Sequence, residues 1–185
     1  MSGRSSRRVV DRLREPHCVI VMGVSGSGKT TVARGLAATL HWSFADGDDF
    51  HTPEYVARMA RGVALTDRDR WPWLDRIADW ISGQMADGVD VAVACSALRK
   101  AYRDRLRDRV PALFCLIDVS EEVAAGRLAA RRLHFMSPSL LKSQLATLEP
   151  LSSDEPGFVV DGDGTREEVL AAAVQAWSNT VAERR

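Results

Sequence analysis

A glycine-rich segment near the start of the chain has the residue types and the spacing that bind a phosphate group. Its residues fit the pattern G-x-x-x-x-G-K-[ST]: Gly23, Val24, Ser25, Gly26, Ser27, Gly28, Lys29 and Thr30. Small residues let the backbone curl so that successive N–H groups point inward at an anion, and a helix that starts near Gly28 adds positive charge there. We expect Lys29 to reach the β- and γ-phosphates of a nucleoside triphosphate, and the hydroxyl of Thr30 to ligate Mg²⁺.

The stretches on either side of this segment strengthen the interpretation. The apolar run "HCVIVM" precedes it and predicts a strand, and apolar residues with helical spacing follow Thr31, the last residue that we assign to the nucleotide site. A strand, a glycine turn and a helix also occur together without any ligand. The two flanking patterns favour a loop that binds a nucleoside triphosphate.

Acidic residues follow the second apolar run of the chain. A kinase for a small alcohol needs one carboxylate to hold the metal ion or its waters, and another to align the attacking hydroxyl and accept its proton. Asp46 and Asp48 are spaced to divide these tasks, and His51 lies close enough in sequence to contact a substrate. We assign Asp46 with Thr30 to Mg²⁺ and Asp48 to the hydroxyl.

Two alternatives to this assignment remain open. An Asp-Gly sequence is also an ordinary turn whose carboxylates are solvated. The third apolar run ends in "ACSALRK" and lacks the acidic residue that often holds the metal, whereas Asp118 closes the fourth run. Asp118 is therefore a second candidate for the metal.

The composition is that of an ordinary globular protein with one domain. The chain has 185 residues, of which 45% are hydrophobic and 27% are charged, enough for a single core. Lysine and arginine total 25 and equal the 25 acidic residues, so no net charge attracts nucleic acid or a membrane surface. No apolar stretch approaches the ~20 residues of a membrane span. We expect neither nucleic acid nor membrane among the partners.

The cysteines and the N-terminal residues bear on location and on the domain boundary. Three cysteines, each inside an apolar run, match no metal site and indicate buried thiols in a reducing cytosol, so we expect a cytoplasmic protein. Residues 1–17 are rich in arginine but lack the apolar segment of a secretory signal. We expect a flexible basic leader, with a presequence as the alternative, ahead of a single domain at 18–185.

Five short apolar runs alternate with helical patterns along the chain, at residues 18–23, 43–46, 90–95, 112–119 and 158–161. They are nearly continuous in apolar residues, as expected of strands that have helices on both faces. Capping patterns mark helix starts between them: Thr52-Pro53, Ser120, Ser137-Pro138 and Thr165 with Glu168. The alternation predicts a three-layer α/β fold of the P-loop NTPase type, with a parallel sheet and the ligand at the carboxyl ends of its strands.

Longer motifs make a family resemblance specific. They occur in the order "MGVSGSGKT", "DGDDFH", "LTDRDRWPWL", "CSALRKAYRD", "RLAARRLHFM" and "LATLEPL". From about residue 19 to residue 161 the chain resembles the gluconate kinase family, within the shikimate-kinase-like and nucleotide-monophosphate-kinase-like P-loop proteins. The resemblance implies a five-stranded parallel sheet with a helical lid at about 126–147. It also implies transfer of the γ-phosphate of ATP to the 6-hydroxyl of D-gluconate, a small-molecule substrate, and suggests a homodimer.

A substrate that is an acidic polyol requires arginines together with hydrogen-bonding groups, because a guanidinium matches a carboxylate bidentately. The resemblance favours Arg70 as a substrate residue. Ser96 and the amides beside it face the cleft after the third strand. Arg99 and Arg103 are four residues apart, so we expect both to point from one helical face at the substrate. The alternative for the arginines near Arg70 is a solvated surface, and the tryptophans beside them are expected to pack.

The expected lid carries further candidates. Arg127 and Arg131 are four residues apart, and we expect them to close over ATP, one of them stabilising the moving phosphoryl group. His134 is a candidate substrate contact, with an ordinary packed or surface histidine as the alternative. The chain departs from the family pattern at Leu133, where glycine is expected and where leucine disfavours a positive φ.

Two other functions use the same loop. One is a kinase for another small hydroxy-acid, such as shikimate, or for a nucleotide. The other is a non-catalytic module that senses ATP by ordering its lid. The acidic pair Asp46 and Asp48 argues against the sensing module, since sensing needs no base.

Overall fold

The structure, a computed structural model, describes residues 15–130 and 138–183. Five parallel strands form one sheet in the order β2-β3-β1-β4-β5. Their bounds are β1 Cys18–Met22, β2 Ser43–Asp46, β3 Val91–Ala94, β4 Ala112–Asp118 and β5 Gly157–Asp161. Every strand ends within one residue of the apolar run that predicted it, and the five-stranded parallel sheet is confirmed.

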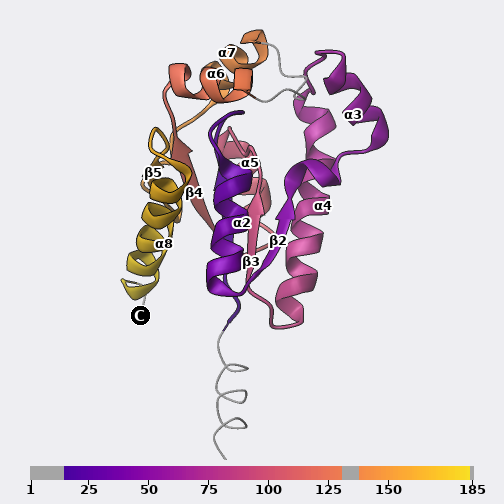
Figure 1. Cartoon of the computed structure of the whole chain (residues 1–185). Helices are drawn as coiled ribbons and strands as arrows, with labels where there is room; N and C mark the ends of the chain where they lie inside the picture. Colours follow the sequence, from indigo (N-terminus) through magenta and orange to yellow (C-terminus); the bar gives the residue numbers. More distant parts are fainter. Residues whose placement is uncertain (1–14, 131–137, 184–185) are drawn as a thin grey trace, which may run out of the picture.

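Helices connect the strands and cover both faces of the sheet (Figure 1). Their bounds are α2 Lys29–Leu40, α3 Pro53–Ala60, α4 Asp67–Ala86, α5 Lys100–Arg107, α6 Glu121–Ala130, α7 Pro138–Thr147 and α8 Arg166–Ala182, with a short 3₁₀ helix η1 at Gly47–Phe50. Alternate residues of β1 explain the layering, because successive side chains of a strand point to opposite faces. Val21 packs with α2 and α8, and Ile20 packs with α4 and α5. The three-layer α/β architecture is therefore confirmed.

A third, smaller apolar cluster lies at the carboxyl ends of the strands. Val24 of the glycine-rich segment packs there with Leu98, Ala124 of α6 and Leu141 of α7. Figure 1 shows α6 and α7 crossing this end of the sheet. The glycine-rich segment therefore packs against Ala124, which precedes the expected lid at 126–147, and against Leu141, which lies inside it.

The helix starts follow the capping patterns. Thr52 accepts a hydrogen bond from the Tyr55 amide at 3.4 Å, and Thr165 with Glu168 forms a complete capping box at the start of α8. Ser120 accepts from the Val123 amide at 3.3 Å. Each of these three caps satisfies an amide that the first turn leaves unpaired, so the three patterns mark where helices begin. Ser137 of the fourth pattern lies outside the described residues.

The folded domain begins one residue earlier than the apolar pattern indicated. The His17 amide donates to Asp90 at 2.6 Å, and its carbonyl oxygen accepts from Val91 at 2.9 Å. Its ring also lies edge-on to Trp177, with centroids 5.0 Å apart. His17, which the expected leader included, is therefore part of the packed domain.

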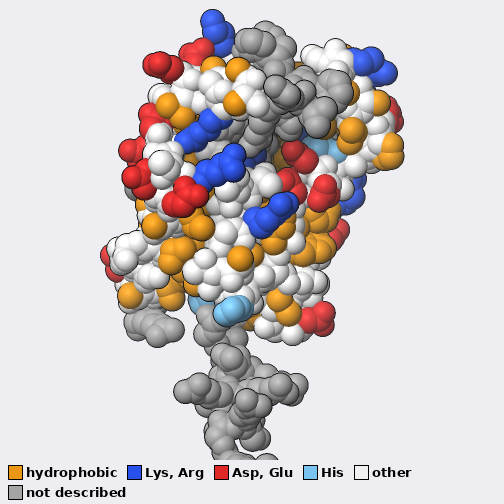
Figure 2. All heavy atoms as spheres, in the orientation of Figure 1, with side chains coloured by type: hydrophobic (Ala, Val, Ile, Leu, Met, Phe, Trp, Pro, Cys, Tyr) orange, Lys and Arg blue, Asp and Glu red, His pale blue; other side chains and the backbone are white. Residues whose placement is uncertain are grey.

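Acidic and basic side chains are mixed on the surface that can be seen, and most of them lie on its upper half (Figure 2). This mixture is in keeping with equal totals of the two signs in the chain. Every helix among the described residues is too short or too polar to cross a membrane.

Candidate active site

The phosphate loop, residues 23–28, connects β1 to α2 at the carboxyl end of the central strand. Gly26 and Gly28 have positive φ values of 83° and 96°, a conformation that glycine adopts without steric cost. A Cβ on Gly26 would also lie 2.5 Å from the carbonyl oxygen of Ala124. The loop therefore needs glycine both for its shape and for its close contact with α6.

Lys29 and Thr30 begin α2 directly after the loop. The ammonium group of Lys29 donates to the carbonyl oxygen of Val24 at 3.3 Å, so its side chain folds back over the loop. The hydroxyl of Thr30 donates to Asp46 Oδ2 at 2.9 Å. The acidic segment after β2 is thereby held against the nucleotide loop.

Asp46 and Asp48 have different surroundings although one glycine separates them. Asp46 caps η1, since its Oδ1 accepts from the Asp48 amide at 3.2 Å. Burial raises the pKa of the Cys95 thiol to about 12. The charge of Asp48 raises this pKa slightly further, and the charges of Lys29 and Arg70 lower it slightly. Charged groups from η1, α2 and α4 therefore all act on the buried thiol that follows β3.

Asp118 lies apart from this group. It ends β4 and lines a separate hollow with Asp161 and Asp163. In the strand order, β3 and β1 stand between β2 and β4, and three strand spacings of about 4.8 Å separate their ends by about 14 Å. The arrangement favours Asp46 over Asp118 as the partner of Thr30 at a metal ion.

His51 stacks on Trp73 with ring centroids 4.6 Å apart and an interplanar angle of 8°. Burial lowers the pKa of His51 to about 4, with further lowering by the charges of Arg70 and Arg76. The imidazole is therefore neutral at pH 7. Its Nδ1 is buried and has no hydrogen-bond partner among the described residues, which fits a group that meets a hydroxyl or a water.

Arg70 and Arg99 both lie beside the ring of Tyr102. Their guanidinium carbons lie 5.7 Å and 5.9 Å from the centre of the Tyr102 ring, within the range of a cation–π contact. Asp67 accepts from the Tyr102 hydroxyl at 2.6 Å and from Arg99 at 2.9 Å. Two of the three arginines expected at the substrate therefore lie beside one aromatic ring, and one of them, Arg99, is bound to the carboxylate of Asp67.

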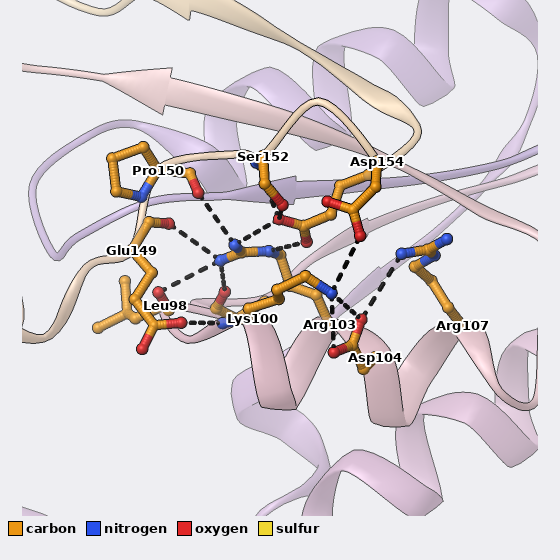
Figure 3. Close-up of polar contacts among 11 residues, drawn as sticks. Leu98, Lys100, Arg103, Asp104, Arg107, Glu149, Pro150, Ser152 and Asp154 are labelled. Atoms are coloured by element: carbon orange, nitrogen blue, oxygen red, sulfur yellow. Dashed lines mark hydrogen bonds and ion pairs between the residues drawn. The ribbon is translucent and has the colours of Figure 1, made fainter.

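Arg103 is placed differently, and its burial does not favour the expectation that it binds the substrate. None of its side chain is exposed, and it forms an ion pair with the equally buried Glu155. It also donates to the carbonyl oxygens of Leu98, Glu149 and Pro150 (Figure 3). Through these hydrogen bonds the Arg103 guanidinium holds the segment before β5 against α5.

The backbone explains why Arg99 and Arg103 diverge. Arg99 is the N-cap of α5 and has an extended conformation, with φ −101° and ψ 147°. The rule that residues four apart share a face applies only where both are helical. Arg99 therefore points toward Asp67 on α4, whereas Arg103 points toward Glu155.

Ser96 lies between β3 and α5, beside the start of the phosphate loop. Its carbonyl oxygen accepts from the Gly23 amide at 3.4 Å, and its side chain is half-buried. Ser96 therefore lies beside the phosphate loop, directly after the end of β3.

Arg127 of α6 spans two loops. It donates to the carbonyl oxygen of Ser27 at 3.3 Å and to that of Gly164, before α8, at 2.7 Å. It also borders a pocket of about 180 Å³, together with Ser27, Gly28, Thr31, Val32, Ala130, Arg166 and Val169. A partly apolar pocket next to the phosphate loop is suited to the nucleobase of a nucleotide. The charge of Arg127 therefore lies at the end of the site that would hold the nucleobase.

Comparison with known proteins decides the family. A model of an AAA domain matches residues 18–151. A gluconokinase of Gluconobacter oxydans (strain 621H) is 47% identical over 162 residues, which cover 87% of this chain and 91% of the relative. The chain belongs to the gluconokinase family.

Solved structures agree with this membership. A gluconokinase from Sinorhizobium meliloti 1021 is 39% identical, with a TM-score of 0.82 over 92% of this chain and 96% of its own. A shikimate kinase from Aquifex aeolicus, at 18% identity and a TM-score of 0.57 over 89% and 98% of the two chains, shares the fold. The P-loop kinase fold of this gluconokinase-family chain is thereby confirmed.

The donor set of this gluconokinase-family site fits Mg²⁺. Among the described residues, no group of three or more histidine, cysteine or acidic side chains is placed to bind a metal ion. Kinases usually hold Mg²⁺ with one or two carboxylates, waters and the phosphates of the nucleotide. Thr30 and Asp46, which already contact one another, supply the hydroxyl and the carboxylate that such a site needs.

Several residues of the site were not anticipated. Asp67 and Tyr102 join the two arginines, Arg166 borders the pocket, and Gln144 of α7 contacts the phosphate loop. Gln144 had a local signal, since it interrupts the apolar face that Leu141, Leu145 and Leu148 form. Arg131 and His134, which were expected in the lid, lie outside the described residues, as does Leu133.

Proposed function

We propose that this gluconokinase-family enzyme transfers the γ-phosphoryl group of ATP to the 6-hydroxyl of D-gluconate, forming 6-phospho-D-gluconate and ADP. The observation that carries the proposal is the contact between Thr30 and Asp46. It joins the loop that binds the triphosphate to the acidic segment that would receive the attacking hydroxyl. Phosphoryl transfer needs this positioning and charge neutralisation more than covalent chemistry.

The nucleotide is held by groups from the loop and from α2. The amides of residues 23–31 would bind the phosphates, with Lys29 at the β- and γ-phosphates. Thr30 and Asp46 would hold Mg²⁺, which neutralises charge that develops on the phosphate oxygens. The base would enter the pocket beside Arg127.

Asp48 would orient the 6-hydroxyl and accept its proton. The hydroxyl oxygen forms the new bond to the γ-phosphorus while the bond to the β-phosphate oxygen breaks, and ADP leaves with that oxygen. An ionised carboxylate can accept the proton because the hydroxyl becomes acidic only as the bond to phosphorus forms.

Arg70 and Arg99 would bind the carboxylate of gluconate. Their shared position at Tyr102 supports this role, and Asp67 would give up its contact with Arg99 when the substrate arrives. His51, neutral at pH 7, and Ser96 can then exchange hydrogen bonds with the hydroxyls of the sugar acid.

The remaining expectations belong to this proposal as well. Arg127 and Arg131 would close over ATP, and His134 would contact the substrate. Three free, buried cysteines support the expectation that the protein is found in a reducing compartment, the cytoplasm. We also propose a homodimer, since two-fold dimers are the commonest assembly of soluble enzymes.

A substrate screen tests the proposal directly. Release of ADP by the purified protein is measured with Mg²⁺-ATP and, in turn, gluconate, shikimate and nucleoside monophosphates. We expect ADP release to depend on gluconate and to vanish in Lys29→Met. Activity on shikimate without activity on gluconate would refute the substrate, and ATP binding without turnover on any of them would favour a sensing module.

A further inference from the structure

A side chain of α7 occupies one amide of the phosphate loop. The Ser25 backbone N–H donates to Gln144 Oε1 at 2.7 Å, across 119 residues of sequence. Ser25 itself is only 7% exposed. Because the loop contributes an N–H donor, the carboxamide must turn its oxygen toward the loop, and this fixes the orientation of the Gln144 side chain.

Packing holds Gln144 in this position. Leu141 is buried with Val24, the loop residue before Ser25, and Leu145 and Leu148 pack against the same cluster. Leu141 and Leu145 lie on one face of α7, Leu148 directly follows the helix, and Gln144 is the polar residue between them. The helix is therefore fixed on the loop by apolar contacts, and the hydrogen bond aims the carboxamide.

The place of this contact along the nucleotide follows from the rest of the site. The pocket suited to the base lies at Ser27, Gly28 and Arg127. At the other end, the ammonium group of Lys29, which reaches β- and γ-phosphates in such loops, lies 3.3 Å from the Val24 carbonyl oxygen. Val24 directly precedes Ser25, so Gln144 stands at the end of the loop where the terminal phosphate belongs.

The chemistry of a carboxamide suits that place. With its oxygen bound to the loop, the Gln144 Nε2 group still has two N–H donors, and it donates to none of the residues that the structure describes. A neutral donor next to a phosphate adds a hydrogen bond to a charged acceptor without adding a charge. We propose that Gln144 Nε2 donates to the γ-phosphate of bound ATP, so that α7 distinguishes ATP from ADP.

This inference rests on the proposed kinase function for its nucleotide, but not on gluconate. Nucleotide affinities measured without any sugar acid therefore test it separately. Dissociation constants for ADP and for the non-hydrolysable analogue AMPPNP, both with Mg²⁺, are obtained by isothermal titration calorimetry. The parent protein is compared with Gln144→Glu, Gln144→Met and Gln175→Glu.

Each variant isolates one part of the contact. Gln144→Glu keeps an oxygen for the Ser25 amide but replaces the donor with a negative charge. Gln144→Met removes both groups at similar volume. Gln175→Glu is the matched control for added charge, because Gln175 is exposed on α8 and pairs with Asn179.

We expect Gln144→Glu to weaken AMPPNP binding about tenfold or more while the ADP affinity changes less than about threefold, since a lost hydrogen bond to a charged group is worth that much. Gln144→Met should shift the ratio in the same direction, and Gln175→Glu should leave both affinities unchanged. An unaltered ratio of the two affinities in Gln144→Glu, whether or not both fall, would overturn the inference and leave Gln144 as a structural anchor of the loop. A parent protein that bound neither nucleotide would overturn the proposed function first, and the inference with it.

Discussion

Asp46 and Asp48 illustrate how two neighbouring carboxylates acquire different tasks. Asp46 uses one oxygen for the Thr30 hydroxyl and the other for the Asp48 amide. Its carboxylate is therefore fixed at the nucleotide loop, where a metal ion would be. The Asp48 side chain is exposed, and an exposed carboxylate can be reached by a substrate hydroxyl.

The assignment of Asp48 as the base predicts a specific change in kinetics. Asp48→Asn should lower kcat by about 10²- to 10⁴-fold, the usual range for a lost general base, and leave the affinity for ATP nearly unchanged. A coupled assay for ADP release measures the first, and calorimetric titration with AMPPNP measures the second. Asp49→Asn, the exposed neighbour, is the control and should retain activity. Normal turnover in Asp48→Asn would refute the role.

At the scale of elements, α5 and the segment before β5 are joined by one buried arginine. Arg103 binds Glu155 and four backbone carbonyl oxygens of two separate segments (Figure 3). The same segment follows α7, which carries Gln144. The buried ion pair therefore holds the segment that follows the C-terminal end of α7, the helix that contacts the phosphate loop.

Removing one partner of this pair should destabilise the domain. Arg103→Met leaves the Glu155 carboxylate buried without its counter-charge, and we expect a loss of about 3–5 kcal/mol in the free energy of unfolding. Urea denaturation measures it. Arg105→Met, on the same helix, removes an exposed pair with Asp75 and should cost less than about 1 kcal/mol. A stable Arg103→Met protein with a raised KM for gluconate would instead restore Arg103 to the substrate site.

At the scale of the whole molecule, the structure predicts sensitivity to acid. The pKa of His51 is lowered to about 4, chiefly by burial. Burial alone would raise the pKa of Glu155, but hydrogen bonds from Arg103 and Ser152 outweigh it and lower the value to about 2. In both cases the unfolded chain takes up protons at a higher pH than the folded protein, so the stability falls as the pH falls.

The two groups act in different pH windows. The unfolded-state pKa values are about 6.5 for histidine and about 4.3 for glutamate, so His51 should reduce the free energy of unfolding between about pH 6.5 and 4, and Glu155 below about pH 4.5. His51→Phe keeps a ring to stack on Trp73 and removes the titrating group. Its unfolding free energy, measured by urea denaturation, should vary less than that of the parent between pH 7 and 4.5. Equal pH dependence in the two proteins would contradict the neutral, buried state of His51.

Local patterns determined much of this protein. The phosphate loop, all five strands and the caps of α3 and α8 follow from residues within a few positions of one another, because hydrogen bonds of the backbone and the periodicity of apolar residues act over short distances. The acidic segment after β2 could be placed at the loop for a similar reason, since the carboxyl ends of parallel strands lie at one edge of the sheet.

The tertiary structure decided which side chains meet. Arg99 and Arg103 are both arginines and lie four residues apart in the sequence. Arg99 nevertheless caps a helix and binds Asp67, whereas Arg103 is buried against Glu155. Gln144 meets Ser25 across 119 residues. Such pairs depend on how α5 and α7 pack on the rest of the domain, and packing is set by contacts between segments that no local pattern of residues encodes.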